Sequence, residues 1–112
     1  MIFQQISRIS PGKTISGTKY TVKGTGQRRG EAALVYRIPS RTGKRPSEKG
    51  ITKSEFEKAH SQLVTKGRFT RKWFNANFVT AASEPCNFAA MGGVFVMLGI
   101  ADYRRGEFNP IV

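Results

Sequence analysis

Residues 51–67 read ITKSEFEKAHSQLVTKG and carry the clearest helix signal in the chain. Thr52 and Glu55 have the spacing of a capping box, in which each side chain accepts a hydrogen bond from the other residue's backbone N–H. Apolar side chains then recur at helical spacing, and Gly67 supplies a stop signal. The sequence therefore predicts a helix over 52–66 whose buried stripe consists of Phe56, Ala59, Leu63 and Val64.

The residues after this helix predict two more helices and a hairpin. Thr70 is a suitable N-cap, so we expect a helix over 71–78. Residues 87–98 (NFAAMGGVFVML) predict a third helix from their apolar spacing, although their central glycines and valines also suit a buried strand. A hairpin over 100–108, turning at 104–107, completes this part of the prediction.

Residues 1–50 predict β-structure instead. We expect a strand over 2–9, a hairpin formed by 14–16 and 19–23, a flexible loop over 24–30 and a strand over 33–38. The prolines, glycines and charges of 39–50 (PSRTGKRPSEKG) predict an exposed linker. The chain is thus predicted to be a single α+β domain over 1–112, with an antiparallel β half at 1–38 and a three-helix half with a C-terminal hairpin at 51–112.

The predicted order of elements in 51–112 resembles a winged helix-turn-helix DNA-binding domain. That resemblance implies that the third helix enters the major groove, with Arg104 and Arg105 on the wing against phosphate or the minor groove. The third helix departs from the pattern, because a recognition helix needs polar side chains that reach base edges and this one offers only Asn87. A helix that is apolar on every face is either covered by the β half or buried in a dimer interface.

Charge is the strongest global signal in the sequence. The chain carries 19 Lys and Arg against 7 Asp and Glu, a net charge of +12, and residues 1–50 hold 11 of the basic and 2 of the acidic residues. Such a field attracts phosphate backbones and gives affinity without sequence preference. The predicted nucleic-acid contacts are Arg28, Arg29, Arg41, Lys44, Arg45, Arg71, Lys72, Arg104 and Arg105.

Cations and aromatics alternate in 67–78, GRFTRKWFNANF. We expect Trp73 and Phe74 to anchor the predicted helix in the core while Arg71 and Lys72 face solvent. The alternative is that nucleic-acid bases stack on these aromatic side chains. It is less favoured, because aromatic side chains are more often buried in a core than used to bind bases.

Other site chemistries find little support. With one Cys and one His, the chain cannot assemble a zinc site, and we expect neither a metal nor a cofactor. The glycines of 24–30 miss the spacing of a dinucleotide-binding loop. A single Cys86 argues against a disulfide framework, and no apolar run reaches the length of about 18 residues that a membrane span needs. We therefore expect a cytoplasmic protein that does not insert into a membrane.

Three classes of function remain open. The first is a small basic protein, accessory or regulatory, that binds DNA or RNA through the phosphate backbone and needs no catalytic residues. The second is an oligomeric module that uses the apolar 87–98 segment to bind another protein. Whichever class applies, we expect the protein to self-associate as a dimer through 87–98, because the predicted helix is apolar on every face. The third is a small basic ribonuclease of toxin type, in which His60 or Tyr36 would assist proton transfer. The first is preferred, and an enzyme is not the preferred interpretation.

Overall fold

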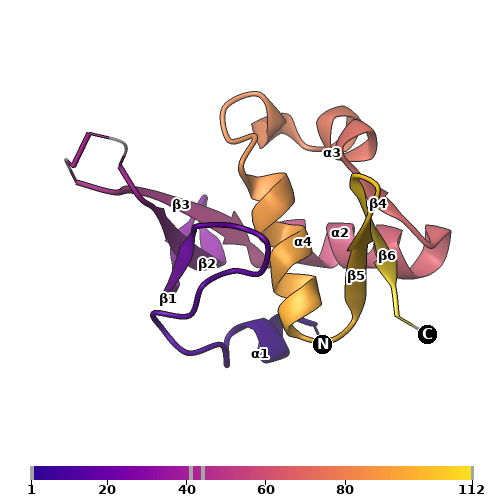
Figure 1. Cartoon of the computed structure of the whole chain (residues 1–112), viewed down its shortest axis with the longest axis horizontal. Coiled ribbons are helices and arrows are strands. Elements are labelled where there is room, and N and C mark those ends of the chain that lie inside the picture. The colour runs from indigo at the N-terminus through magenta and orange to yellow at the C-terminus, as the bar shows by residue number, and fades with distance from the viewer. Residues whose placement is uncertain (1, 41, 44, 112) are drawn as a thin grey trace.

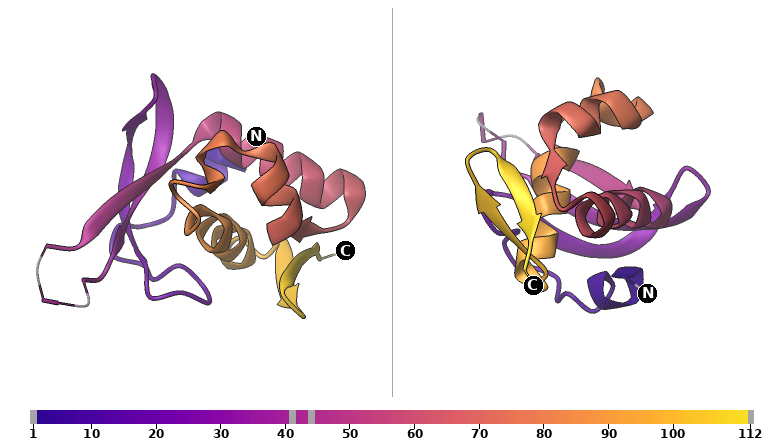
Figure 2. Two further views of the ribbon diagram at one scale, coloured as in Figure 1. Left: turned by 90° about the horizontal axis from the view of Figure 1, so that it is seen from above. Right: turned by 90° about the vertical axis from the view of Figure 1, so that its right-hand side faces the viewer.

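The computed structural model describes residues 2–40, 42–43 and 45–111, which form an α+β fold with one helix between two antiparallel sheets (Figure 1). The elements in chain order are α1 (Ile2–Ile6), β1 (Thr21–Arg28), β2 (Glu31–Ile38), β3 (Ser47–Thr52), α2 (Lys53–Lys66), β4 (Phe69–Thr70), α3 (Arg71–Asn77), the short 3-10 helix η1 (Val79–Ala81), α4 (Asn87–Met97), β5 (Ala101–Arg104) and β6 (Glu107–Pro110). The N-terminal sheet has the order β1-β2-β3, and the C-terminal sheet has the order β4-β6-β5. Figures 1 and 2 both show α4 between the two sheets.

The helix predicted over 52–66 is confirmed as α2, together with both of its end signals. The Glu55 backbone N–H donates to Thr52 Oγ1 at 3.2 Å, and the Thr52 N–H donates to Glu55 Oε1 at 2.9 Å. Gly67 ends the helix at φ 77°, a left-handed conformation that glycine adopts without a Cβ clash. The predicted place of Val64 on the buried stripe is wrong. Its side chain is 60% exposed, because a turn of about 100° per residue carries position 64 past the edge of that stripe.

The N-terminal half differs from the prediction in three places. The hairpin expected from 14–16 and 19–23 is reduced to an isolated bridge between Thr14 and Thr21, because β1 begins at Thr21 and pairs with β2 instead. Residues 2–6, expected in a strand, form α1, and the buried residues Ile2, Phe3 and Ile6 have helical spacing. The loop expected over 24–30 is mostly strand, because β1 runs to Arg28 and pairs with β2 through a bulge between Val22 and Gly24. Ladder hydrogen bonds to β2 outweigh the weak strand propensity of these glycines.

The expected linker over 39–50 is wrong for its last four residues. Ser47–Thr52 form β3, which pairs antiparallel with β2 from Ile38 opposite Ser47 to Ala33 opposite Thr52. The strand predicted over 33–38 is confirmed within β2. The first residues of β3 are polar because they are exposed on an edge strand, whereas Ile51 is fully buried. A polar edge strand therefore has the composition of a linker.

The helical half follows the prediction closely. Thr70 caps α3 by accepting the Trp73 backbone N–H at 3.1 Å. The third predicted helix is α4, and the C-terminal hairpin is β5–β6, which turns after Arg104. Gly99 lies at φ 74° just after α4, as expected for a helix stop that only glycine adopts without strain.

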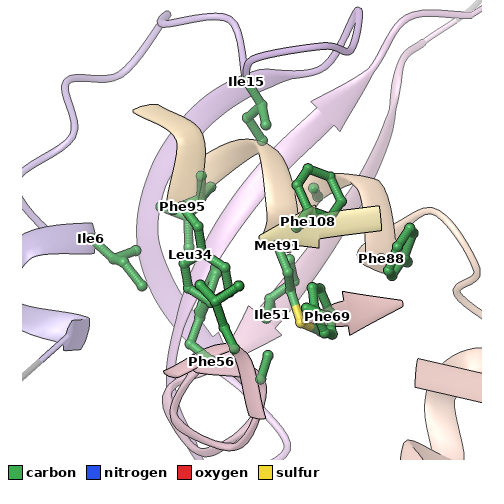
Figure 3. Packing of buried hydrophobic residues seen from close by; sticks show 14 of the residues in the cluster. Ile6, Ile15, Leu34, Ile51, Phe56, Phe69, Phe88, Met91, Phe95 and Phe108 are labelled. Atoms are coloured by element: carbon green, nitrogen blue, oxygen red, sulfur yellow. The ribbon is translucent and has the colours of Figure 1, made fainter. Parts of the chain in front are cut away.

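The two central glycines of α4 allow close packing on both sides of the helix. A Cβ on Gly92 would lie 2.1 Å from the ring of Phe108, and one on Gly93 would lie 2.4 Å from the carbonyl oxygen of Ser16. Eight of the 11 residues of α4 are buried. Figure 3 shows Phe95 of α4, Leu34 of β2 and Phe56 of α2 together in the core beside this helix, and the ring centroids of Phe56 and Phe95 lie 6.1 Å apart. The apolar 87–98 segment is therefore core.

Candidate nucleic-acid interface

Carboxylates neutralise only a few of the cations that the structure describes. Glu48 pairs with both Lys23 and Arg37. The remaining ion pairs among the described residues are Arg29–Glu55, Arg68–Glu107 and Arg104–Asp102. Lys23 and Arg37 hold the pKa of the Glu48 carboxyl below its usual range. Because the chain has 19 basic and 7 acidic residues, most of the positive charge stays uncompensated at the surface.

Three of the predicted contacts lie on the N-terminal sheet or its loops. Arg28 lies against Gly50 of β3, where a Cβ would come within 2.5 Å of Arg28 Cγ, and it donates to the carbonyl oxygen of Gln27 at 2.8 Å. Arg29, at φ 50° in the β1–β2 turn, pairs with Glu55. Arg45 is exposed just before β3. The predicted contacts Arg41 and Lys44 lie outside the described residues.

The predicted contact Arg71 begins α3 and places its guanidinium over the rings of Phe74 and Phe88. Its guanidinium is 4.7 Å from the centroid of the Phe88 ring and donates to the carbonyl oxygen of Pro85 at 2.7 Å. Arg71 also lines a cavity of about 370 Å³ together with Tyr103 of β5. Two further predicted contacts, Arg104 and Arg105, stand at the exposed tip of the β5–β6 hairpin.

Lys72, the next residue of α3, lies in a different place, between α3 and α2. Two adjoining grooves of about 330 and 550 Å³ run there, and Gln62 and Trp73 line both. We call this pair the basic groove, because its walls carry Lys58, Lys66, Arg68 and Lys72. Among the described residues, no acidic side chain lines either part of it. Figure 2 shows α3 folded back beside α2, the two helices that form the walls.

The basic groove includes three cations that the sequence interpretation missed, Lys58, Lys66 and Arg68. A usable signal was present, because Lys58, Gln62 and Lys66 follow one another at four-residue intervals and so share one face of α2. That face borders the buried stripe, because Lys66 lies two helical turns after the buried Ala59. What the sequence could not supply is the position of α3, which places Lys72 opposite this face.

The cations of the basic groove differ in how firmly the protein holds them. Lys58 Nζ donates to the carbonyl oxygen of Asn77 at 2.6 Å and lies 5.1 Å from the centroid of the Phe78 ring. Arg68 pairs with Glu107 but keeps 59% of its side chain exposed. Lys66 and Lys72 are exposed and form no side-chain hydrogen bond or ion pair with the described residues. These two lysines are therefore the free charges of the groove.

Trp73 and Phe74, both expected in the core, have different environments. Phe74 is fully buried, as predicted. Trp73 is only half-buried and stands where the two parts of the basic groove meet. Its nearest aromatic neighbours are Phe69, at 5.9 Å and 70°, and Phe78, at 5.6 Å and 84°. The expectation of a core residue therefore holds only in part for Trp73.

The residues proposed for proton transfer do not converge on a site. Tyr36 is fully buried, and its hydroxyl donates to Asn87 Oδ1 at 2.5 Å. Burial raises the Tyr36 pKa far above its ordinary value, so the hydroxyl stays protonated. His60 packs against Phe95 with ring centroids 6.0 Å apart, and burial lowers its pKa. Within the described part of the chain, no group of three or more His, Cys, Asp or Glu is placed to hold a metal ion.

The third helix cannot serve as a recognition helix in this arrangement. Asn87, its one candidate for a base contact, is fully buried and is held by Tyr36 and by Glu84, whose Oε2 accepts from Asn87 Nδ2 at 2.9 Å. Seven of the other ten residues of α4 are buried as well, and Ala89, Val96 and Met97 are half-buried. Any contact with nucleic acid must therefore come from other surfaces.

Across residues 2–40, 42–43 and 45–111, no helix combines the length and apolarity needed to cross a bilayer. Comparison with protein-family models, curated proteins and solved structures gives no match for this chain.

Proposed function

We propose that this protein binds nucleic acid through the phosphate backbone, with the basic groove as the principal contact surface. The observation that carries the proposal is the convergence of Lys58, Lys66, Arg68 and Lys72 on one groove without a carboxylate among its described lining residues. The four cations come from α2, the segment after it and α3, so the fold gathers charges that are separate in the sequence. A cationic channel of this kind follows a phosphate backbone and releases its counterions on binding.

Three predicted contacts outside the groove extend the same surface chemistry. Arg45, Arg71 and Arg105 are exposed and have no carboxylate partner among the described residues. Arg29 and Arg104 are paired with Glu55 and Asp102, which reduces their net attraction for phosphate. The unpaired arginines would add peripheral contacts that raise the association rate and the salt dependence.

The winged-helix resemblance remains a proposal for residues 51–112. Its support is the order of elements, in which α2, β4, α3 and α4 precede the β5–β6 hairpin. The burial of α4 argues that base edges are not read by a helix in the major groove. We therefore propose binding that depends on charge and has little sequence specificity, to DNA or RNA, in the reducing cytoplasm where a single free cysteine is stable.

The test is a binding titration of labelled mixed-sequence duplex and single strands, at low and at physiological salt. The variant Lys66→Ala with Lys72→Ala removes the two free charges of the basic groove. Lys13→Ala with Lys53→Ala removes the same charge at two exposed positions outside it. We expect the groove variant to bind more weakly to every sequence and to flatten the logarithmic salt slope by about two units, with a smaller effect from the control.

Two outcomes would count against the proposal. Absence of binding at low salt would reject nucleic acid as the ligand. Equal weakening by both double variants would mean that net charge alone attracts the polyanion and that the basic groove is not the contact surface.

A further inference from the structure

We infer that the basic groove binds single-stranded nucleic acid and that the indole of Trp73 stacks on an unpaired base. This inference rests on the proposed function, because the cations of the groove must first attract the strand. Beyond the proposed function, it specifies that the bound nucleic acid is single-stranded and that Trp73 distinguishes a single strand from a duplex.

The position of Trp73 is the first reason. Trp73 lines both parts of the basic groove, so a strand that follows the cations from Lys66 to Lys72 passes the indole. Grooves of about 330 and 550 Å³ fall in the size range of small-ligand sites, about 300–1,000 Å³. Each part is therefore large enough for a nucleotide unit on one side of the tryptophan.

The open surface of the indole is the second reason. Both aromatic neighbours of Trp73, Phe69 and Phe78, meet it at steep interplanar angles, and no ring among the described residues stacks parallel to it. Its indole N–H donates to none of those residues. Since the described part of the chain contains no buried side-chain nitrogen or oxygen without a partner, this N–H faces solvent. Trp73 thus keeps a donor available to a ligand, and no ring of the described residues stacks on its face.

The backbone around Trp73 is held firmly, which a stacking platform requires. Thr70 Oγ1 accepts the Trp73 backbone N–H at 3.1 Å, and Asn77 Nδ2 donates to the Trp73 carbonyl oxygen at 2.9 Å. The next residue, Phe74, is fully buried and anchors α3 in the core. The indole is therefore presented from a short helix that is fixed at its start, its middle and its end.

The physics of stacking selects the single strand. In a duplex every base is stacked and paired, so an indole at the surface meets only phosphate and sugar. An unpaired base has a free face, and a contact with an aromatic side chain is tolerant of sequence because every base has such a face. The cations then bind both forms, whereas Trp73 strengthens only the single strand.

The experiment uses the fact that Trp73 is the only tryptophan in the chain, so its intrinsic fluorescence reports on this position alone. The probes are an oligothymidylate, an oligouridylate, a mixed-sequence duplex with the same number of phosphates, and inorganic polyphosphate, which has no bases. We expect the two single strands to quench Trp73 strongly. The duplex and polyphosphate should bind, as seen by competition with a labelled strand, while changing the fluorescence little.

Two variants provide an independent measurement. Trp73→Leu replaces the indole with an apolar side chain that has no aromatic face. Trp73→Phe replaces it with a smaller aromatic ring, and it serves as the test if the leucine variant folds poorly. We expect Trp73→Leu to weaken single-strand binding about tenfold and Trp73→Phe to weaken it less, with duplex and polyphosphate affinities unchanged. Circular dichroism of each variant checks that the protein is folded, so that a change in affinity is not caused by unfolding.

The outcomes separate this inference from the proposed function. If the duplex and polyphosphate bind but single strands leave Trp73 fluorescence unchanged, the stacking inference is overturned and charge-driven binding stands. The same conclusion follows if folded Trp73→Leu or Trp73→Phe loses affinity for duplex and single strand equally. If none of the four probes binds at low salt, the proposed function fails, and this inference fails with it.

Discussion

The guanidinium of Arg29 lies 2.5 Å from Oε1 of Glu55, a contact that joins the β1–β2 turn to the first turn of α2. The same carboxylate accepts the backbone N–H of Thr52 and, through Oε2, the hydroxyl of Thr80 at 3.0 Å. Glu55 therefore fastens three separate segments, and the capping box is one part of a larger connection. Arg29 contributes to this connection, which makes it less available to phosphate than its sequence position suggests.

Glu55→Ala should destabilise the protein by about 2 kcal/mol, because donors on Arg29, Thr52 and Thr80 lose their shared acceptor at a largely buried position. Glu57→Ala is the matched control, since Glu57 lies in the same helix turn and forms no ion pair with the described residues. We expect the control to change the free energy of unfolding by no more than about 0.5 kcal/mol. Urea unfolding of both variants measures the difference, and equal losses would show that Glu55 has no special role.

Phe74→Ala and Trp73→Ala should differ in stability although the residues are neighbours. Phe74 is fully buried, so its removal leaves a cavity and should cost about 3–5 kcal/mol. Trp73 is half-buried, and its truncation removes less contact from the core. Chemical denaturation of the two variants should therefore give a clearly smaller loss for Trp73→Ala. A loss as large as that of Phe74→Ala would place the indole in the core and weaken its assignment to the groove.

The parts of the fold that the sequence predicted are those with local signals. The capping box of Thr52 and Glu55 and the stop at Gly67 act within a few residues, so α2 could be located from the sequence alone. Strands β1 and β3 could not be located in this way, because their glycines and charges are typical of a loop. Both segments become strands by pairing with β2. The basic groove was also hidden, since it forms only when α3 folds back beside α2.

Gly93→Leu tests whether α4 is core or an interface between copies of the chain. A Cβ at this position would lie 2.6 Å from Ile15 Cγ2 and 2.4 Å from the carbonyl oxygen of Ser16, so the larger side chain should destabilise the fold by about 3 kcal/mol. Self-association through 87–98 stays a prediction. Its original reason was that an apolar helix would otherwise be exposed, and this reason no longer holds because most of α4 is buried within the chain. Light scattering of the unmodified protein over a concentration series measures it directly. A dimer that Gly93→Leu dissociates without unfolding would restore the interface interpretation.

His60 should make stability fall at mildly acidic pH. Burial lowers its pKa in the folded protein below the ordinary value of 6.5, so the unfolded chain binds the proton more readily. Stability is therefore full above pH 6.5 and is lost as the pH falls from there toward the lower folded pKa. His60→Gln should remove this part of the pH dependence. Urea unfolding of both proteins at pH 7.5 and 5.5 is the measurement, and an identical pH dependence would exclude His60 as its source.

Arg71→Ala and Lys72→Ala should have different effects on stability and on binding, although the sequence predicted that both residues contact nucleic acid in the same way. Arg71 packs over the Phe88 ring and donates to the Pro85 carbonyl oxygen, so its loss should cost about 1 kcal/mol of stability. Lys72 has no described partner and lines the basic groove, so Lys72→Ala should leave unfolding nearly unchanged. It should instead weaken binding to all sequences and flatten the salt slope by about one unit, because one phosphate contact disappears. Binding and unfolding measured on the same two proteins decide the matter. If Lys72→Ala leaves the salt slope intact while Arg71→Ala flattens it, the strand runs past the cavity beside Tyr103 and not through the basic groove.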